Sequence, residues 1–240
     1  MVMAETLVMV GVRTLGKAVA LHFAAQGWQV VCAARTRADV EAVAAEVDQA
    51  GGQGVPVVCD LGDRTSLEAL VRERTRIDLC IAAQTSGGRF GALPLVDIAD
   101  EELDRGYAAY LRGTWNLMKA VGPRLLAQGN GTFLQIGTSS GVRTKEGFAG
   151  LGAIQHGLRA LVQVAAREWR AHGVHVAYLP VDGAIESERT REWITRSGAD
   201  RAIPQVEIAR ACEYLHRQDR RAWTHELVLR PSGSDWTAPT

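Results

Sequence analysis

The chain has 240 residues, of which 47% are apolar and 22% are charged. This is long for one domain, but single α/β domains of this size are common, and the composition provides enough apolar surface for a large core. Lysine plus arginine and aspartate plus glutamate number 27 each, so the formal net charge is zero, which argues against a nucleic-acid-binding or membrane-binding surface.

The first ten residues include Glu5 and no basic residue, which is unlike a signal peptide. No stretch approaches the roughly 20 apolar residues of a membrane span. The four cysteines show neither CxxC nor Cys/His spacing, so we expect buried free thiols, no metal site and a reducing, cytoplasmic location.

Apolar runs rich in Val, Leu and Ile alternate with helical stretches, which predicts βαβ units. The predicted strands are Thr6–Val10, Gln29–Ala34, Gly54–Cys59, Asp78–Ala83, Gly131–Ile136, Val174–Leu179 and Glu226–Leu229. The predicted helices are Leu15–Ala25, Arg37–Gln49, Arg64–Arg74, a short and a long helix within Glu101–Gln128, Ala149–His172 and Pro204–Arg217. Residues 1–240 are therefore expected to form one Rossmann-type, doubly wound domain, with a seven-stranded parallel sheet and helices on both faces.

One long irregular segment, Val181–Asp200, contains Trp193 and acidic and basic residues by turns. Long ordered loops near strand ends often cover ligands, so we interpret it as a substrate lid. The alternative is a solvated surface helix without a role in binding.

The sequence Gly11-Val12-Arg13-Thr14-Leu15-Gly16 joins the first strand to the first helix. A tight glycine turn at this place brings backbone N–H groups and the positive end of the helix to a pyrophosphate. The strand-turn-helix-strand context favours dinucleotide binding over an ordinary βα turn.

Arg35 stands at the end of the second strand, where an NAD enzyme places a ribose-binding acid. A guanidinium does not accept hydrogen bonds from a 2′-hydroxyl but suits a 2′-phosphate. Arg13, in the glycine turn, is within reach of the same phosphate. Together the two arginines favour NADP(H) over NAD(H), although each taken singly is more often a solvated charge.

The chain resembles the short-chain dehydrogenase/reductase family over nearly its whole length. The resemblance rests on the order of elements, on Asp60-Leu61 after the third strand and on Gly173-Val174-His175-Val176 at the start of the sixth strand. Phe148–Leu161 followed by Asp182-Gly183-Ala184-Ile185 is similar to a divergent branch in which phenylalanine often replaces the catalytic tyrosine. The chain departs from the family's GxxxGxG turn by one missing residue and by Thr14 at the middle glycine. The resemblance implies a cofactor site made of Gly11, Arg13, Thr14, Leu15, Gly16, Arg35, Asp60, Leu61, Ala83 and Gln155.

Ordinary members of that family use a tyrosine as general acid, a lysine four residues later, a serine thirteen residues earlier and an asparagine in the preceding helix. An ungapped alignment through Phe148–Leu161 places Leu151 at the tyrosine, Gln155 at the lysine and Thr138 at the serine, and Tyr110 stands at the asparagine. The family's NNAG segment is replaced by Ala82-Ala83-Gln84-Thr85. Leucine transfers no proton and glutamine brings no charge, so we do not expect an ordinary tyrosine-dependent ketoreductase.

The remaining candidates for chemistry are the hydroxyls of Thr138, Ser139 and Ser140, the Gln155 amide and Tyr110. Tyr110 lies one helical turn from Tyr107, so both phenols are expected on one face; the alternative is a packed core tyrosine. The other polar residues considered are Lys145 and Glu146 as substrate contacts or solvated charges, His156 as a helix-packing or interface residue, and Asp182 as a base or a turn former.

Three functions fit these residues. The first is an atypical NADP(H)-dependent oxidoreductase that acts on a small organic molecule, such as a secondary metabolite. In this enzyme, hydroxyl groups and water take the place of the tyrosine. The second is a non-redox enzyme such as a cyclase, isomerase or dehydratase, and the third is a non-catalytic binding subunit. We expect a homodimer or homotetramer, because Leu158, Leu161, Val162, Ala165 and Trp169 form an apolar stripe on a helix that the family uses for assembly.

Overall fold

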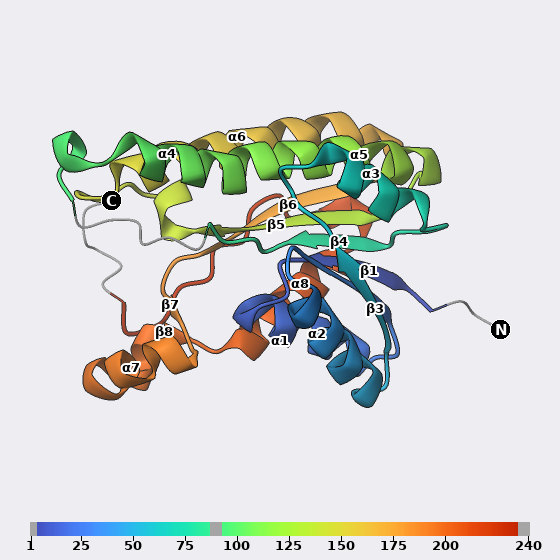
Figure 1. The fold of residues 1–240 in the computed structure, drawn as a ribbon, viewed down its shortest axis with the longest axis horizontal. Coiled ribbons are helices and arrows are strands. Elements are labelled where there is room, and N and C mark those ends of the chain that lie inside the picture. The colour runs from blue at the N-terminus through green and yellow to red at the C-terminus, as the bar shows by residue number, and fades with distance from the viewer. Residues whose placement is uncertain (1–3, 87–92, 235–240) are drawn as a thin grey trace.

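The computed structural model describes residues 4–86 and 93–234, and six of its strands form one parallel sheet in the order β3-β2-β1-β4-β5-β6 (Figure 1). The strands are β1 (Thr6–Val10), β2 (Gln29–Ala34), β3 (Gln53–Val58), β4 (Leu79–Ala82), β5 (Thr132–Thr138) and β6 (His175–Val181). The strand order reverses between β1 and β4, which is the point where open α/β sheets bind ligands. The predicted Rossmann-type, doubly wound fold is confirmed.

The predicted seventh strand does not complete a ladder. Glu226–Leu229 runs parallel to β6 but joins it only through isolated bridges. The Leu227 N–H donates to the Tyr178 carbonyl at 3.1 Å, and the Leu229 N–H donates to the Pro180 carbonyl at 3.0 Å. Pro180 has no N–H to donate in return, so the hydrogen-bond pattern breaks in the middle of the segment. The described part of the sheet therefore has six regular strands instead of seven.

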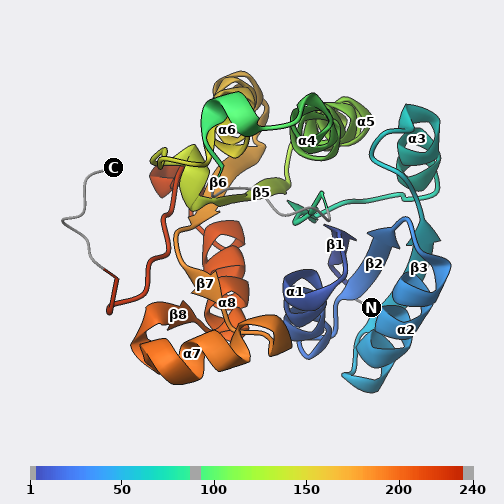
Figure 2. The ribbon, with the colours of Figure 1, turned by 60° about the vertical axis from the view of Figure 1, so that its left-hand side comes forward.

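Helices cover both faces of the sheet and enclose two apolar cores (Figures 1 and 2). One face is covered by α1 (Thr14–Ala24), α2 (Arg37–Gln49) and α8 (Gln205–His216). The other is covered by α3 (Arg64–Arg72), α5 (Gly113–Gln128) and α6 (Ala149–Trp169). Phe23 and Trp28 lie in the first core and Phe133 and Trp169 in the second. Burial of each such side chain stabilises the fold by about 1.5–3 kcal/mol, so both layers hold the sheet in place.

The strand and helix predictions agree closely with the structure where periodicity is strong. The ranges of β1, β2 and α2 are as predicted, and Val40, Val43, Ala44 and Val47 form the predicted buried stripe of α2. Helix α6 ends at Trp169 and a 3-10 turn completes the predicted range to His172.

The predicted pair of helices within Glu101–Gln128 is one continuous helical run. Helix α4 (Asp100–Gly106) continues through a π-helical turn at Tyr107–Arg112 into α5. No proline lies between Asp100 and Gly122, so nothing in the sequence breaks the helix where a boundary was expected. Single π turns inside α-helices are frequent at functional sites.

The segment predicted to be irregular, Val181–Asp200, contains short regular elements. It includes β7 (Ala184–Ile185) and α7 (Arg191–Ser197), and β7 pairs in parallel with β8 (Ala202–Ile203). This unit lies on the same side of the sheet as α8 (Figure 2). Its assignment as a lid stays a prediction.

All four cysteines are free and buried, as predicted. Burial raises the pKa of the Cys59 thiol to about 11 and that of Cys32 to about 12, so neither is a reactive thiolate at neutral pH. None of the helices in the described ranges is long and apolar enough to cross a bilayer.

Candidate active site

The turn from β1 into α1 is tight enough to require glycine at two positions. A Cβ atom on Gly11 would lie 2.8 Å from the Ala83 carbonyl oxygen, and one on Gly16 would lie 1.7 Å from the Gly11 carbonyl oxygen. Gly11 also has a left-handed backbone, with φ of 88°. The first glycine therefore lets β1 approach the end of β4, and the second lets α1 begin directly against the turn, as a dinucleotide-binding turn requires.

Thr14, or a gap beside it, stands at the position of the family's middle glycine, and Thr14 has a left-handed backbone conformation. Its φ is 33°, the left-handed region that β-branched residues avoid. This conformation costs about 1–2 kcal/mol in a residue with a side chain. The turn is thus preserved despite the substitution, at the expense of local strain.

The N-terminus of α1 is available to an anion. It has no side-chain cap and no acidic residue in its first turn, so its free N–H groups keep their positive end potential. Arg13, which precedes the helix, is exposed and donates through Nη2 to Thr85 Oγ1 at 3.1 Å. Thr85 follows β4, which lies on the opposite side of β1 from β2. In this conformation Arg13 therefore points away from the β2 end, and its convergence with Arg35 on one phosphate stays a prediction.

The adenine end of the predicted site lies after β2 and β3. Arg35 follows β2 and is exposed. Asp60 follows β3 and accepts a hydrogen bond from the Gly62 N–H at 2.8 Å. Asn116, buried on α5, donates to the Leu61 carbonyl at 2.8 Å and so fixes this loop against the helix layer. These contacts hold the loop rigidly at the carboxyl edge of the sheet.

A buried polar network replaces the family's NNAG segment after β4. Gln84 Nε2 donates to Thr114 Oγ1 at 2.7 Å, and Thr114 in turn donates to Gln135 Oε1 at 2.8 Å. Gln84 Oε1 and Ser86 Oγ are buried without a hydrogen-bond partner among the residues that the structure describes. Such unpaired atoms cost about 1–3 kcal/mol each, so a ligand that bonds to them at this edge gains that energy.

The predicted hydroxyl and amide groups meet around the end of β5. Thr138 is the last residue of β5, and its Oγ1 is a third buried atom that lacks a partner in the described ranges. Ser139 begins the following 3-10 turn and is half-buried. Gln155 is 1% exposed on α6, and Leu151, one turn earlier on the same helix, is half-buried. The site therefore presents a hydroxyl and an amide, with an apolar side chain where a proton donor would be.

Tyr178, on β6, is a site residue that the sequence reasoning missed. Its phenol is fully buried and donates to Gln155 Oε1 at 3.4 Å. The signal in the sequence was a pair of glycines, Gly137 and Gly141, flanking Thr138: a Cβ on either would lie within 2.2 Å of the Tyr178 hydroxyl. The Tyr178 phenol therefore reaches the end of β5 from the neighbouring strand β6.

The two tyrosines before α5 both lie in the π-helical turn, whose hydrogen bonds connect residues five apart instead of four. Tyr107 is 42% exposed and accepts a hydrogen bond at 3.3 Å from Arg112, which is five residues on. Tyr110 is half-buried. That the two phenols share one face stays a prediction.

Asp182 is an anchored carboxylate in this structure. It is 2% exposed; its Oδ1 accepts from Arg143 Nη2 at 2.9 Å and its Oδ2 accepts from Arg230 Nε at 2.7 Å. With both oxygens bonded to guanidinium groups, this geometry favours neither a base nor a simple turn former. The pairing ties the ends of β5 and β6 to the segment after Leu229.

The other polar candidates lie outside this cluster. Lys145 and Glu146 are exposed, as their solvated interpretation predicts. His156 is exposed, and its Nδ1 lies 3.0 Å from the Gly152 carbonyl of its own helix; it packs on no other helix within the described part of the chain, and its role at an interface stays a prediction. No group of three or more metal-ligating side chains occurs among the described residues.

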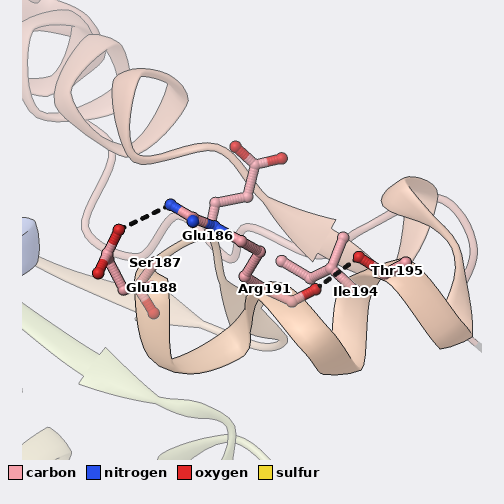
Figure 3. Close-up of a pocket in the computed structure, with 6 residues that line it drawn as sticks. All are labelled: Glu186, Ser187, Glu188, Arg191, Ile194 and Thr195. Atoms are coloured by element: carbon pink, nitrogen blue, oxygen red, sulfur yellow. Dashed lines mark hydrogen bonds and ion pairs between the residues drawn. The ribbon is translucent and has the colours of Figure 1, made fainter.

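A cavity of about 420 Å³ opens against the predicted lid (Figure 3). Its lining residues are Glu186, Ser187, Glu188, Arg191, Ile194 and Thr195. Arg191 Nη2 donates to Glu188 Oε1 at 2.7 Å across its rim. None of the predicted cofactor or catalytic residues lines this cavity. The site at the carboxyl ends of β1, β4 and β5 stays a prediction.

Comparisons with known proteins agree with this geometry. A family model described as enoyl-(acyl carrier protein) reductase matches residues 11–229. The short-chain reductase protein NovJ of Streptomyces niveus is 27% identical over 235 residues, which cover 95% of this chain and 87% of that protein. The 3-oxoacyl-acyl-carrier-protein reductase FabG of Thermotoga maritima is 25% identical over 201 residues, 82% of this chain and 79% of its own.

Solved structures show the same fold. A short chain dehydrogenase from Bacillus anthracis has a TM-score of 0.84 at 22% identity, and the match covers 98% of both chains. A metagenomic short-chain oxidoreductase in complex with NADP has a TM-score of 0.76 at 25% identity and covers 95% of this chain and 97% of its own. With the family model spanning most of the sequence, the chain belongs to the short-chain dehydrogenase/reductase family of oxidoreductases.

Proposed function

We propose that the protein is an NADP(H)-dependent oxidoreductase for a small organic substrate that works without the family's tyrosine–lysine pair. The observation that carries the proposal is the β1–α1 turn. Gly11 and Gly16 leave no room for a Cβ, and the uncapped N-terminus of α1 opens at the switch point of the sheet. Those features suit a pyrophosphate.

Preference for NADP(H) follows from Arg35. An exposed guanidinium at the end of β2 is suited to the negatively charged 2′-phosphate of NADP(H). The 2′-hydroxyl of NAD(H) needs a hydrogen-bond acceptor at this place, which arginine does not provide. The relative solved with NADP supports the same cofactor class for this fold. Gln155 is placed to hydrogen-bond a ribose hydroxyl as a neutral group.

When bound, NADPH supplies a hydride to a carbonyl carbon of the substrate. The unpaired Thr138 hydroxyl is placed to hold the carbonyl oxygen, with Ser139 beside it. Leu151 contributes no proton, so the proton for the alkoxide comes from these hydroxyls or from water. Losing a positioned acid typically costs about 100- to 10,000-fold in rate, which suits an activated substrate better than a simple ketone.

The test is NADPH consumption with a panel of simple ketones. We expect negligible turnover by the wild-type protein and measurable carbonyl reduction by the double variant Leu151→Tyr with Gln155→Lys. The single variant Leu151→Tyr is the matched control: without a lysine beside it, tyrosine keeps a pKa near ~10 and is a weak acid catalyst. Fast ketone reduction by the wild-type protein contradicts the proposal.

A second candidate function is a non-redox enzyme, such as a cyclase, isomerase or dehydratase, built on the same site. Leu151, which transfers no proton, and the polar network at Gln84 favour it, because neither supplies the acid that a ketoreductase needs. This candidate moves ahead if the double variant binds NADPH and remains inert towards every ketone.

A further inference from the structure

Tyr178 is seated in a slot that the chain leaves open for it. Its side chain comes from the middle of β6, the last strand in the order of the sheet, and none of its surface is exposed. A Cβ on Gly137 would lie 2.1 Å from its hydroxyl oxygen, and one on Gly141 would lie 2.2 Å away. An alanine at either position would expel the phenol, so the two glycines and the tyrosine form one packed unit around Thr138.

The phenol is a hydrogen-bond donor in this slot. Burial raises the pKa of Tyr178 above its ordinary value, and the carboxylate of Glu226 acts in the same direction. The group is therefore protonated at neutral pH. The single hydroxyl proton is donated to Gln155 Oε1, at 3.4 Å.

This contact determines which way the Gln155 amide faces. Its oxygen accepts from Tyr178, so its NH2 group points the other way. In the described part of the chain Nε2 makes no hydrogen bond, and it is not among the side-chain atoms that are both fully buried and unpaired. The donor end of this otherwise buried amide is therefore not fully enclosed.

We propose that Tyr178 is a positioning residue that holds the Gln155 amide with its oxygen inward and its NH2 group toward a bound nicotinamide ribose. The proposal rests on the proposed function, because it assigns Gln155 to the NADP(H) site. Tyr178 does not touch the cofactor: it acts through Gln155. A neutral, fixed donor thus takes the place of the family's charged lysine.

A double-mutant cycle on NADPH affinity tests this proposal. Tyr178→Phe removes the hydroxyl and keeps the ring, and Gln155→Met removes the amide and keeps the length. Loss of one oriented hydrogen bond corresponds to about three- to tenfold weaker binding. We expect Tyr178→Phe to weaken NADPH binding by that factor in the wild-type background and to have no further effect in Gln155→Met. Tyr214→Phe, on the exposed face of α8, is the matched control and leaves affinity unchanged.

A second measurement reads the contact without cofactor. In protein labelled with ¹⁵N at glutamine, the side-chain NH2 signal of Gln155 is identified by its loss in Gln155→Met. We expect this signal to shift in Tyr178→Phe and not in Tyr214→Phe. The proposal is overturned if Tyr178→Phe leaves this signal in place, or if it weakens NADPH binding equally in both backgrounds. If the wild-type protein binds no NADPH while the signal responds as expected, the contact stands and the proposed function and its cofactor role fail.

Discussion

Gly16 is the position where one added methyl group tests the cofactor turn most severely. In Gly16→Ala the new Cβ would lie 1.7 Å from the Gly11 carbonyl oxygen, and ordinary contact begins at 3.4 Å. The turn must open by about the difference between those values, and backbone on both sides resists. Overpacking of this kind costs about 1–3 kcal/mol of folding free energy. The shift also moves the N–H groups at the start of α1; losing one charge-assisted hydrogen bond to a phosphate weakens binding by about 10- to 100-fold.

Urea unfolding and NADPH titration of the same protein measure both effects. The matched control is Gly150→Ala in α6, whose Cβ would meet only Leu103 Cδ1 at 3.8 Å. That variant should keep its NADPH affinity and lose no stability, because alanine is the better helix former. If Gly16→Ala binds NADPH as tightly as the wild-type protein, the turn is not a pyrophosphate site and the reasoning is refuted.

Two other predictions concern assembly and pH. Most of the stripe predicted for assembly lies in the core instead, because Leu158, Val162, Ala165 and Trp169 are buried. We still expect the outer faces of α5 and α6 to form a homo-oligomer interface, since Trp115 and Val164 are 47% and 52% exposed. Light scattering at micromolar concentration should show an oligomer that Trp115→Glu disrupts, and a monomeric wild-type protein refutes this. Burial lowers the pKa of His175 and His216 below the ordinary value of 6.5, so the unfolded chain takes up protons first. Stability should be full above pH 6.5 and fall as the pH drops below it, by up to about 1.4 kcal/mol per pH unit for each histidine. In His175→Gln, the free energy of unfolding measured with urea should change less with pH below 6.5 than in the wild-type protein. An unchanged dependence on pH contradicts the assignment.

The cofactor half of the molecule was predictable because its physics is local. A strand, a glycine turn and a helix follow one another directly, so the close approach of Gly16 to the Gly11 carbonyl involves residues of one short segment. The approach of Gly11 to Ala83 is long-range, but the position of the glycine at the end of a strand already indicated a tight turn. The buried stripe of α2 is predictable for the same reason, since its apolar positions repeat with the helical period.

The chemistry half depends on contacts between distant segments. Tyr178 on strand β6 contacts Gln155 on helix α6. In the sequence, only Gly137 and Gly141 indicate the space that the phenol fills. Asp182 looked like a possible base until both its oxygens were found on arginines that are far away in sequence. The interrupted seventh strand is an exception, because its cause lies in the sequence itself: Pro180 in β6 has no N–H to donate to the neighbouring segment.

The central claim is that this chain holds NADP(H) at the carboxyl ends of β1 and β2. Fluorescence titration of NADPH and NADH into the wild-type protein and Arg35→Ala tests it most directly. We predict that the wild-type protein binds NADPH more tightly than NADH, and that Arg35→Ala weakens NADPH binding by about tenfold or more while leaving NADH binding unchanged. Equal affinity for the two cofactors, no binding of either, or an unchanged preference in Arg35→Ala would contradict the account.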